Sequence, residues 1–191
     1  MHKIVCLYGA SGSGKSTIAK YLKEQYGFKE LCSHTTRAMR PNEQDGRDYH
    51  FVSKELFGDM VRAGEFVEWT EYSGNYYGLA FRTINQHLYS DDMIIVVDKN
   101  GLRELLQHYP DSVIGIFVEA GEATVRRRML DRGDDPEVVE ERVSHALSTG
   151  EFDAGDFDSV YKVKSLDWRS VVLALTGIMD KEQIKRVEDV N

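Results

Sequence analysis

The chain has 191 residues, of which 41% are hydrophobic and 29% are charged, a balance typical of one soluble globular domain. Its formal net charge of −8 argues against a general nucleic-acid or anionic-membrane binder, because such proteins need a positive field to attract phosphate groups. Two cysteines are too few for a disulfide framework or a zinc site, and no apolar stretch approaches the roughly 20 residues of a spanning helix. These features predict a cytoplasmic protein that meets any phosphate with a local basic cluster.

Short apolar runs rich in β-branched residues, each followed by a helical pattern, are typical of parallel strands that are buried on both faces. Such runs cover residues 3–8, 93–97 and 113–118, and a weaker one covers 159–163. Helical patterns occur at 15–25, 102–108, 123–132, 137–148 and 168–187. We therefore predict an α/β fold of three layers, with a central parallel sheet between helices.

Two segments interrupt this pattern. Between residues 34 and 79, aromatic and polar residues alternate, which indicates small half-exposed strands of an inserted subdomain. Phe57, Met60 and Val61 follow helical spacing there and are expected in a core. Residues 126–144 are rich in arginine and contain a Gly-Asp-Asp-Pro turn, so we interpret them as a hinged lid. The core of this single domain, 1–191, then comprises residues 1–33, 80–125 and 145–191.

The strongest motif follows the first strand. Residues 9–16 read GASGSGKS, a full match to the P-loop pattern G-x-x-x-x-G-K-[ST] between a strand and a helix. Glycines let successive backbone N–H groups point at a phosphate, and the helix N-terminus adds partial positive charge. Lys15 is expected to serve the β- and γ-phosphates during catalysis, and Ser16 to offer its hydroxyl to Mg²⁺. The predicted ATP site comprises Gly9, Ala10, Ser11, Gly12, Ser13, Gly14, Lys15, Ser16 and Thr17.

Asp98 directly follows the apolar run 93–97, where P-loop enzymes place a carboxylate near Mg²⁺. Aspartate also ends strands merely because it begins a turn, so a metal-related role and a turn role both stay open. Residues 98–101 read DKNG, the D-x-x-G spacing of a GTPase switch, but we find no N-K-x-D element that would read a guanine base.

A second basic cluster lies at residues 33–41, SHTTRAMRP, where hydroxyls accompany two guanidinium groups. Arginine binds phosphate oxygens in bidentate fashion, and tyrosines can complete such a site; a solvated basic loop is the alternative. The sequence continues with DGRDYHFVS at 45–53, EFVEW at 65–69 and GNYYG at 74–78. Together with the P-loop, and in the same order, these motifs resemble guanylate kinases over roughly residues 3–160.

The resemblance implies Mg²⁺-assisted, in-line phosphoryl transfer from ATP to GMP or dGMP. It places the GMP phosphate on Arg37, Arg40, Tyr49 and Tyr77, and the guanine edge on Glu68. A carboxylate can accept from both N1–H and the 2-amino group of guanine, whereas adenine offers neither donor; a plain surface charge is the alternative for this glutamate. The predicted GMP site comprises Ser33, Arg37, Arg40, Tyr49, Glu68, Tyr77 and Asp98.

Three arginines of the predicted lid are further catalytic candidates. Arg128 and Arg132 are four residues apart on one helix face, and Arg142 lies on the apolar stripe of the next helix. The resemblance implies that they close over the ATP phosphates, because transfer between two anions requires charge neutralisation rather than a dedicated base. For Arg142 the alternative is a structural ion pair with Glu141 or Asp153.

Four positions depart from the family pattern. Leu79 stands where a hydroxyl usually donates to guanine O6, and Val96 stands where the usual D-x-D has its first acid. Lys164-Ser165 replaces an Asn-Asp pair at the adenine side, and Ala10 replaces a loop proline. An unmatched O6 predicts weaker base selectivity, unless another donor such as Arg82 or Thr83 compensates.

Two rival interpretations remain. One is a kinase of another nucleoside monophosphate or of a small phosphorylated acceptor; Glu68 speaks against a sugar phosphate, which has no base for a carboxylate to read. The other is a non-catalytic binding module of the same fold, which would have no need of Lys15 and Ser16. The six histidines show no metal-ligand spacing, and the oligomeric state is undecided.

Overall fold

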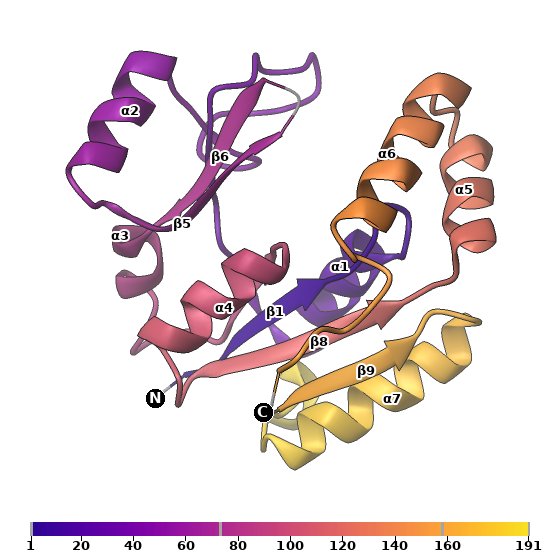
Figure 1. Cartoon of the computed structure of the whole chain (residues 1–191). Coiled ribbons are helices and arrows are strands. Elements are labelled where there is room, and N and C mark those ends of the chain that lie inside the picture. The colour runs from indigo at the N-terminus through magenta and orange to yellow at the C-terminus, as the bar shows by residue number, and fades with distance from the viewer. Residues whose placement is uncertain (1, 73, 158, 191) are drawn as a thin grey trace.

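The computed structural model describes residues 2–72, 74–157 and 159–190 (Figure 1). Its larger sheet has five parallel strands in the order β2-β7-β1-β8-β9. They are β1 (Ile4–Tyr8), β2 (Lys29–Glu30), β7 (Met93–Val96), β8 (Val113–Glu119) and β9 (Val160–Lys164). The four predicted strands are confirmed to within one residue at each end, and the two-residue β2 adds an edge strand.

Helices precede or follow most of these strands. They are α1 (Lys15–Tyr26), α2 (Lys54–Arg62), α3 (Phe81–Asn85), α4 (Lys99–His108), α5 (Glu122–Asp131), α6 (Pro136–Ser148), α7 (Trp168–Lys181) and the 3₁₀ helix η1 (Val187–Val190). Within the described ranges, no helix combines the length and the apolar character that crossing a bilayer requires. The ends of the predicted domain, Met1 and Asn191, lie outside the described residues.

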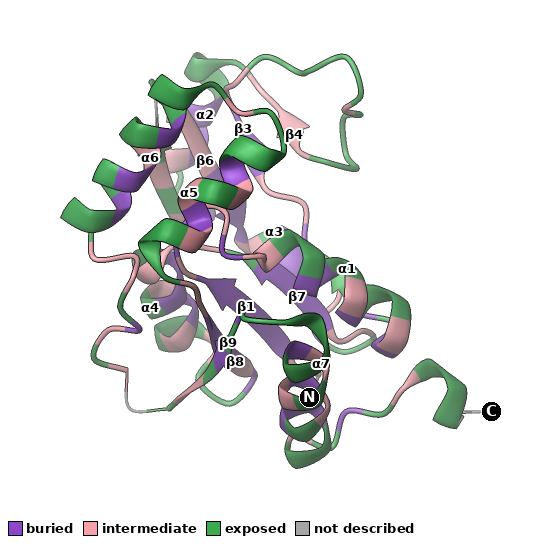
Figure 2. Ribbon diagram, turned by 90° about the vertical axis from the view of Figure 1, so that its right-hand side faces the viewer, coloured by how far each residue is buried: buried purple, intermediate pink, exposed green. Residues whose placement is uncertain are grey.

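Alternate residues of the central strand face opposite sides of the sheet, because strand side chains alternate. Val5 and Leu7 pack with α1 and α7, whereas Ile4 and Cys6 pack with α4. All four are fully buried, and Figure 2 shows the central strands enclosed between helices. The order is helix, sheet, helix, so the predicted three-layer α/β fold is confirmed.

Two helix ends differ from the prediction for identifiable reasons. The helix α4 begins three residues early, because the Asp98 side chain caps it by accepting the N–H of Gly101 at 2.8 Å. The helix α7 ends at Lys181 rather than near residue 187, because Gln183 adopts a φ of 60°, which a continuing helix excludes. Ile184 then returns to the core on the α1 side of the sheet.

The segment between β2 and β7 contains a second sheet, in the order β4-β3-β6-β5. Its strands are β3 (His34–Thr35), β4 (His50–Phe51), β5 (Phe66–Tyr72) and β6 (Asn75–Ala80). An irregularity between Phe66 and Glu68 shifts the antiparallel register of β5 against β6. Phe57 and Met60 of α2 are buried against Phe66, with Val61 partly buried in the same cluster, so the helical spacing predicted there is confirmed.

Helices α5 and α6 form a pair that projects beyond the end of β8 (Figure 1). Val125 and Met129 of α5 pack against Val139 of α6 and against Ala10 of the P-loop. Their outer faces are exposed, and buried residues form a stripe between them (Figure 2). Residues 126 and 144, the predicted limits of the lid, fall inside these helices, so the pair and the predicted lid share most of their length.

Candidate functional site

The loop between β1 and α1 runs tightly against two neighbouring elements. Gly9 and Gly12 have φ angles of 129° and 80°, which favour glycine. A Cβ on Gly9 would lie 2.8 Å from the carbonyl oxygen of Val118, and one on Gly12 would lie 3.0 Å from that of Val125. Both glycines are therefore required by the close approach of the loop to β8 and α5.

The helix α1 begins directly after this loop and has no side-chain cap. Its N-cap residue, Gly14, has a φ of 109°, and the N–H of Ile18 donates to the Gly14 carbonyl at 3.0 Å. The N–H groups of the first turn have no acceptor within the helix, and the helix dipole places partial positive charge at the same point. Loop and helix together have a geometry that favours an anion, and the predicted ATP site stays a prediction.

Lys15 lies inside this loop. Its Nζ donates to the carbonyl oxygens of Gly9 at 2.6 Å and Ala10 at 2.9 Å. Burial lowers the Lys15 pKa to about 8. The charge of Glu151 opposes this change, and the smaller effect of Arg132 adds to it. The ammonium is thus still charged at neutral pH, and it is held by neutral acceptors.

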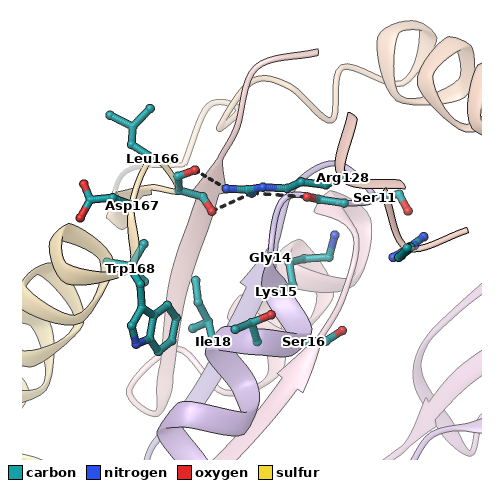
Figure 3. Close-up of a pocket in the computed structure, with 14 residues that line it drawn as sticks. Ser11, Gly14, Lys15, Ser16, Ile18, Arg128, Leu166, Asp167 and Trp168 are labelled. Atoms are coloured by element: carbon teal, nitrogen blue, oxygen red, sulfur yellow. Dashed lines mark hydrogen bonds between the residues drawn. The ribbon is translucent and has the colours of Figure 1, made fainter. Parts of the chain in front are cut away.

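A cavity of about 510 Å³ opens beside the loop and is lined by the P-loop, by Arg128 and Arg132 and by the segment from Ser165 to Trp168. In Figure 3, Arg128 lies between the loop and that segment. Its Nη1 donates to the Ser13 carbonyl and the Ser165 hydroxyl, both at 3.0 Å, and its Nη2 donates to the Ser165 carbonyl at 2.8 Å. Arg128 therefore connects the phosphate loop to the chain that follows β9.

The other two candidate arginines meet at one carboxylate. Arg132 donates from Nε and Nη2 to the two oxygens of Asp134, at 2.9 and 2.5 Å, and Arg142 donates to the same residue at 3.2 Å. The two guanidinium groups lower the pKa of Asp134, with the Arg132 hydrogen bond as the largest cause. The pairing of Arg142 with Glu141 or Asp153 that the sequence left open is wrong, because the α5–α6 turn brings Asp134 to it instead.

Two more arginines of α5 behave differently from these three. Arg126 pairs with Glu122 and Glu140, so it fixes α5 to α6, whereas Arg127 is exposed. Of the five arginines between residues 126 and 142, Arg128 and Arg132 are the two that line the cavity.

A second cationic site lies in the smaller sheet. Arg37 makes a bidentate pair with Glu43 at 2.7 and 3.0 Å, and the backbone N–H of Arg40 donates to the same carboxylate at 2.8 Å. The Arg37 guanidinium lies 5.6 Å from the centre of the Tyr49 ring, and that ring contacts Tyr77 edge-on at 5.9 Å. The structure thus brings together Arg37, Tyr49 and Tyr77, as predicted, while the Arg40 side chain is exposed.

Glu43 was not predicted as part of this site. It follows Arg40 by three residues, within a run that also contains acids at 45 and 48, and the sequence offers no way to tell which acid faces Arg37. The Arg37 hydrogen bond holds the pKa of Glu43 below its ordinary range, and the same pair raises the pKa of Arg37. The contact shows that the Arg37 fork accommodates two oxygens of one anion at the same time.

Glu68 lies at the junction of the two sheets. A Cβ on Gly101 of α4 would be 3.4 Å from the Glu68 Cδ, and the Leu79 backbone N–H interacts with the carboxylate. Burial raises the Glu68 pKa to about 7, and the nearby charge of Asp98 raises it further, against that Leu79 hydrogen bond. A carboxylate this poorly solvated gains from any ligand that supplies N–H donors.

The structure explains the surroundings of three positions that depart from the family pattern. Leu79 is 0% exposed and packs in the core cluster on the α4 side of the sheet, so it is a core residue. Val96 is exposed at the end of β7, and Ala10 is buried against α5. Neither suggested replacement donor is placed beside Glu68 by a contact: Arg82 donates from Nη2 to Nε2 of the buried His34 at 2.9 Å.

Ser33 and Asp98 have backbone or capping roles in the structure. The Ser33 carbonyl accepts the N–H of His50 at 2.8 Å, which pairs β3 with β4. Asp98 caps α4, so the turn role that the sequence left open is observed. A metal-related role of Asp98 stays a prediction.

Known proteins similar to this chain are guanylate kinases. The family model described as guanylate kinase matches residues 1–180. A guanylate kinase of Vibrio vulnificus is 34% identical over 184 residues, covering 92% of this chain and 89% of that protein. One from Thiobacillus denitrificans is 39% identical over 139 residues, covering 71% of this chain and 66% of that protein. The crystal structure of guanylate kinase from Anaplasma phagocytophilum aligns with a TM-score of 0.66 at 25% identity, covering 97% of this chain and 89% of that one.

Proposed function

The chain belongs to the guanylate kinase family, and from that premise we propose that it transfers the γ-phosphoryl group of ATP in line to GMP or dGMP. Its homologues are phosphotransferases that act on a nucleoside monophosphate. The observation that carries the proposal for this chain is the presence of two separate cationic sites, one at the P-loop and one around Arg37, with the half-buried carboxylate of Glu68 at the junction of the sheets.

On the donor side, the P-loop backbone and the first turn of α1 are proposed to hold the ATP phosphates. Lys15 is already placed within the loop, and a phosphate would replace its carbonyl partners with a stronger, charged acceptor. Because an anion favours the ammonium form, ATP would also raise the lowered pKa of Lys15.

The family implies Mg²⁺, and the residues at the loop fit that ion. Mg²⁺ usually takes one or two protein oxygens and fills its other positions with phosphate oxygens and water. Ser16 presents an exposed hydroxyl on the first turn of α1, which is one such oxygen. The Oδ1 atom of Asp98 caps α4, which leaves its Oδ2 for the ion or for a water bound to the ion. When bound, the ion neutralises charge on the β- and γ-phosphates.

On the acceptor side, Arg37 is proposed to bind the GMP phosphate through its fork, with the phenolic groups of Tyr49 and Tyr77 completing the site. Support comes from their contacts and from Glu43, which shows that a two-oxygen acceptor fits the fork. Glu68 would accept from N1–H and the 2-amino group of guanine. Arg40 and Ser33 are proposed to contribute from the edge of the same site.

Closure would bring the two substrates together. We propose that residues 34–79 act as the monophosphate-binding subdomain and residues 126–144 as the lid, around the core formed by the rest of the chain. Arg128, Arg132 and Arg142 would then neutralise the transferred phosphoryl group, which is the main demand of transfer between two anions. Support comes from the cavity, which Arg128 and Arg132 line beside Lys15.

We also propose a cytoplasmic location. The two cysteines are free thiols, one buried and one partly buried, which suits a reducing compartment.

The decisive assay measures ADP release with Mg·ATP and a panel of acceptors: GMP, dGMP, AMP, CMP, UMP and ribose 1,5-bisphosphate. We expect turnover with GMP and dGMP that is lost in Lys15→Met, which removes the loop ammonium. Silence with GMP and turnover with another acceptor would move the assignment to that acceptor. Silence with all six, combined with tight ATP binding, would favour the binding-module interpretation.

A further inference from the structure

A single carboxylate lies between two of the candidate lid arginines. Asp134 accepts from Nε and Nη2 of Arg132 at 2.9 and 2.5 Å, and its Oδ2 also accepts from Nη1 of Arg142 at 3.2 Å. The side chain of Asp134 is 22% exposed, and those of Arg132 and Arg142 are 49% and 27% exposed. The two guanidinium groups therefore share one anion in a partly buried place, where their attraction is screened less than at the open surface.

The backbone of the α5–α6 turn fixes the position of this carboxylate. The N–H of Gly133, whose φ is 90°, donates to the Leu130 carbonyl at 2.9 Å. The N–H of Asp134 donates to the Met129 carbonyl at 3.1 Å, which completes the pair of hydrogen bonds of a Schellman motif. Asp135 follows directly and caps α6 with its side chain. Of the two adjacent acids, one therefore caps a helix and the other is left to pair with the arginines.

Arg132 is the member of this group that reaches the cavity beside the P-loop. It lines the cavity together with Lys15 and Arg128, whereas Asp134 and Arg142 are not among the described residues that line it. The Nε–Nη2 edge of Arg132, a planar fork that suits two oxygens of a phosphate, is occupied by Asp134. A phosphate on the other edge of the same guanidinium group would still lie near this carboxylate, and like charges repel at such distances. The acid therefore opposes an anion that enters the cavity beside Arg132.

We propose that Asp134 is an internal anion that competes with the γ-phosphate of the nucleotide donor for Arg132 and Arg142. A γ-phosphate that reaches these arginines must displace the carboxylate or bind against its charge, so Asp134 lowers the affinity of the chain for ATP. ADP has no γ-phosphate and leaves the contact intact. The inference rests on the proposed function, because it assumes that these two arginines bind the phosphoryl group that ATP transfers.

The test is titration calorimetry with Mg·ATP and Mg·ADP in the absence of any acceptor. Asp134→Asn keeps the shape of the side chain and removes its charge. Its dissociation constant for ATP should be about 3- to 30-fold lower than that of the wild type, the factor expected when two partly exposed ion pairs no longer oppose binding, and that for ADP should stay within about twofold. An unchanged or higher dissociation constant for ATP would overturn the inference, because it would show that Asp134 positions the arginines for the phosphate instead of competing with it. An equal gain for ADP would overturn the assignment to the γ-phosphate.

Two further variants separate this contact from a general effect of charge. Asp131→Asn is the matched control, because Asp131 is an exposed acid at the end of α5 and its loss removes one negative charge from the same part of the lid. Its dissociation constant for ATP should equal that of the wild type. In a chain that carries Arg132→Met and Arg142→Met, Asp134→Asn should change this constant by less than about twofold, because no guanidinium group remains to be released. A gain that persists in that background, or that Asp131→Asn reproduces, would overturn the inference.

The outcome is independent of the identity of the acceptor. Because the titrations contain no acceptor, a gain in ATP affinity for Asp134→Asn would support the inference even if GMP were not turned over. Normal turnover of GMP by the wild type, together with an unchanged dissociation constant for ATP in Asp134→Asn, would support the proposed acceptor and refute the role of Asp134.

Discussion

Glu68 offers the sharpest test, because ionisation of its carboxyl group should favour GMP recognition and at the same time lower the stability of the fold. Burial and the charge of Asp98 raise its pKa from an ordinary 4.5 to about 7. Between those two pH values the folded chain holds a proton that the unfolded chain has released. Stability therefore falls as pH rises from 4.5 to 7, and the loss is complete above the folded pKa.

The magnitude follows from the size of the change in pKa. Each tenfold change in an acid constant corresponds to about 1.4 kcal/mol, so the full cost of ionising Glu68 in the fold is about 3 kcal/mol, an upper limit because the side chain is partly exposed. Glu68→Gln keeps the shape and cannot ionise. Relative to the wild type, its free energy of unfolding should increase by up to about 3 kcal/mol between pH 4.5 and 8.

The assay combines urea unfolding with steady-state kinetics across the same pH range. For the wild type, kcat/KM for GMP should rise through an apparent pKa near 7, because the ionised carboxylate is the acceptor for both guanine donors. Glu68→Gln should lower kcat/KM for GMP about 100-fold while leaving the slow reaction with AMP unchanged, since hydrogen bonds to a charged group are worth about 1.5–3 kcal/mol. The variant also controls for titration of the GMP phosphate, which both proteins share.

Two results would refute this reasoning separately. A stability difference between variant and wild type that stays constant from pH 5 to 8 would show that the Glu68 pKa is not raised. A variant that keeps its full preference for GMP over AMP would show that Glu68 does not read the base.

Three further predictions concern the cationic sites and the loop. Arg37→Lys should raise KM for GMP about 10- to 100-fold in steady-state assays, because a single ammonium cannot reproduce the bidentate fork. The exposed control Arg62→Lys should leave this KM unchanged. An unchanged KM in Arg37→Lys would remove Arg37 from the phosphate site. Arg142→Met should lower kcat about 100-fold in rapid-quench measurements, with the KM values for ATP and GMP nearly unchanged. The control Arg127→Met, on the exposed face of α5, should match the wild type. A kcat of Arg142→Met within about twofold of the wild-type value would assign Arg142 to its ion pair alone. Gly9→Ala should lower the free energy of unfolding by about 1–3 kcal/mol in chemical unfolding and weaken ATP binding in titration calorimetry, because the added Cβ would press on the β8 backbone. A variant as stable as the wild type would show that the loop relaxes without cost.

Most of the fold could be predicted because its signals are local. The central strands are short β-branched runs whose period and flanks are visible in the sequence, and all four were found. Short pieces were missed: the strands at Lys29–Glu30 and His34–Thr35 have two residues each, and α3 spans Phe81–Asn85. Elements this short owe their structure to the neighbours that pair with them, so their own residues carry little signal. The strand at Asn75–Ala80 was also not predicted individually, although it lies in the segment predicted to contain small strands.

The site could be predicted only as far as single residues, because partners across the chain depend on loop geometry. The alternative to a lid role for Arg142 was an ion pair with Glu141 or Asp153, yet Glu141 is its helical neighbour and adjacent helical residues do not face each other. Gly133, with a φ of 90°, reverses the chain after α5 and places Asp134 against Arg142 instead. The Gly-Asp-Asp-Pro run predicted the turn itself, but not that Asp134 would meet Arg142 while Asp135 caps α6.

Position 79 shows a different limit. The family pattern indicated that Leu79 replaces a base-contacting hydroxyl, and the expectation of weaker selectivity follows from that substitution alone. In the fold this side chain is buried in the core, while its backbone N–H interacts with Glu68. Any residue except proline offers that N–H, so the contact with Glu68 does not depend on the leucine side chain, which a sequence comparison at one position does not reveal.

The cations of the two sites differ in the charge of their partners. Lys15 and Arg128 donate to carbonyl and hydroxyl oxygens, so neutral groups position them and their positive charge stays uncompensated by those contacts. Arg37, Arg132 and Arg142 donate to carboxylates, so their charge is offset by those partners. In a chain of net charge −8, this arrangement concentrates the resting positive field at the P-loop and limits it elsewhere. An anion that bound any of these three arginines would have to compete with its internal carboxylate, so each would contribute less to binding than an unpaired cation.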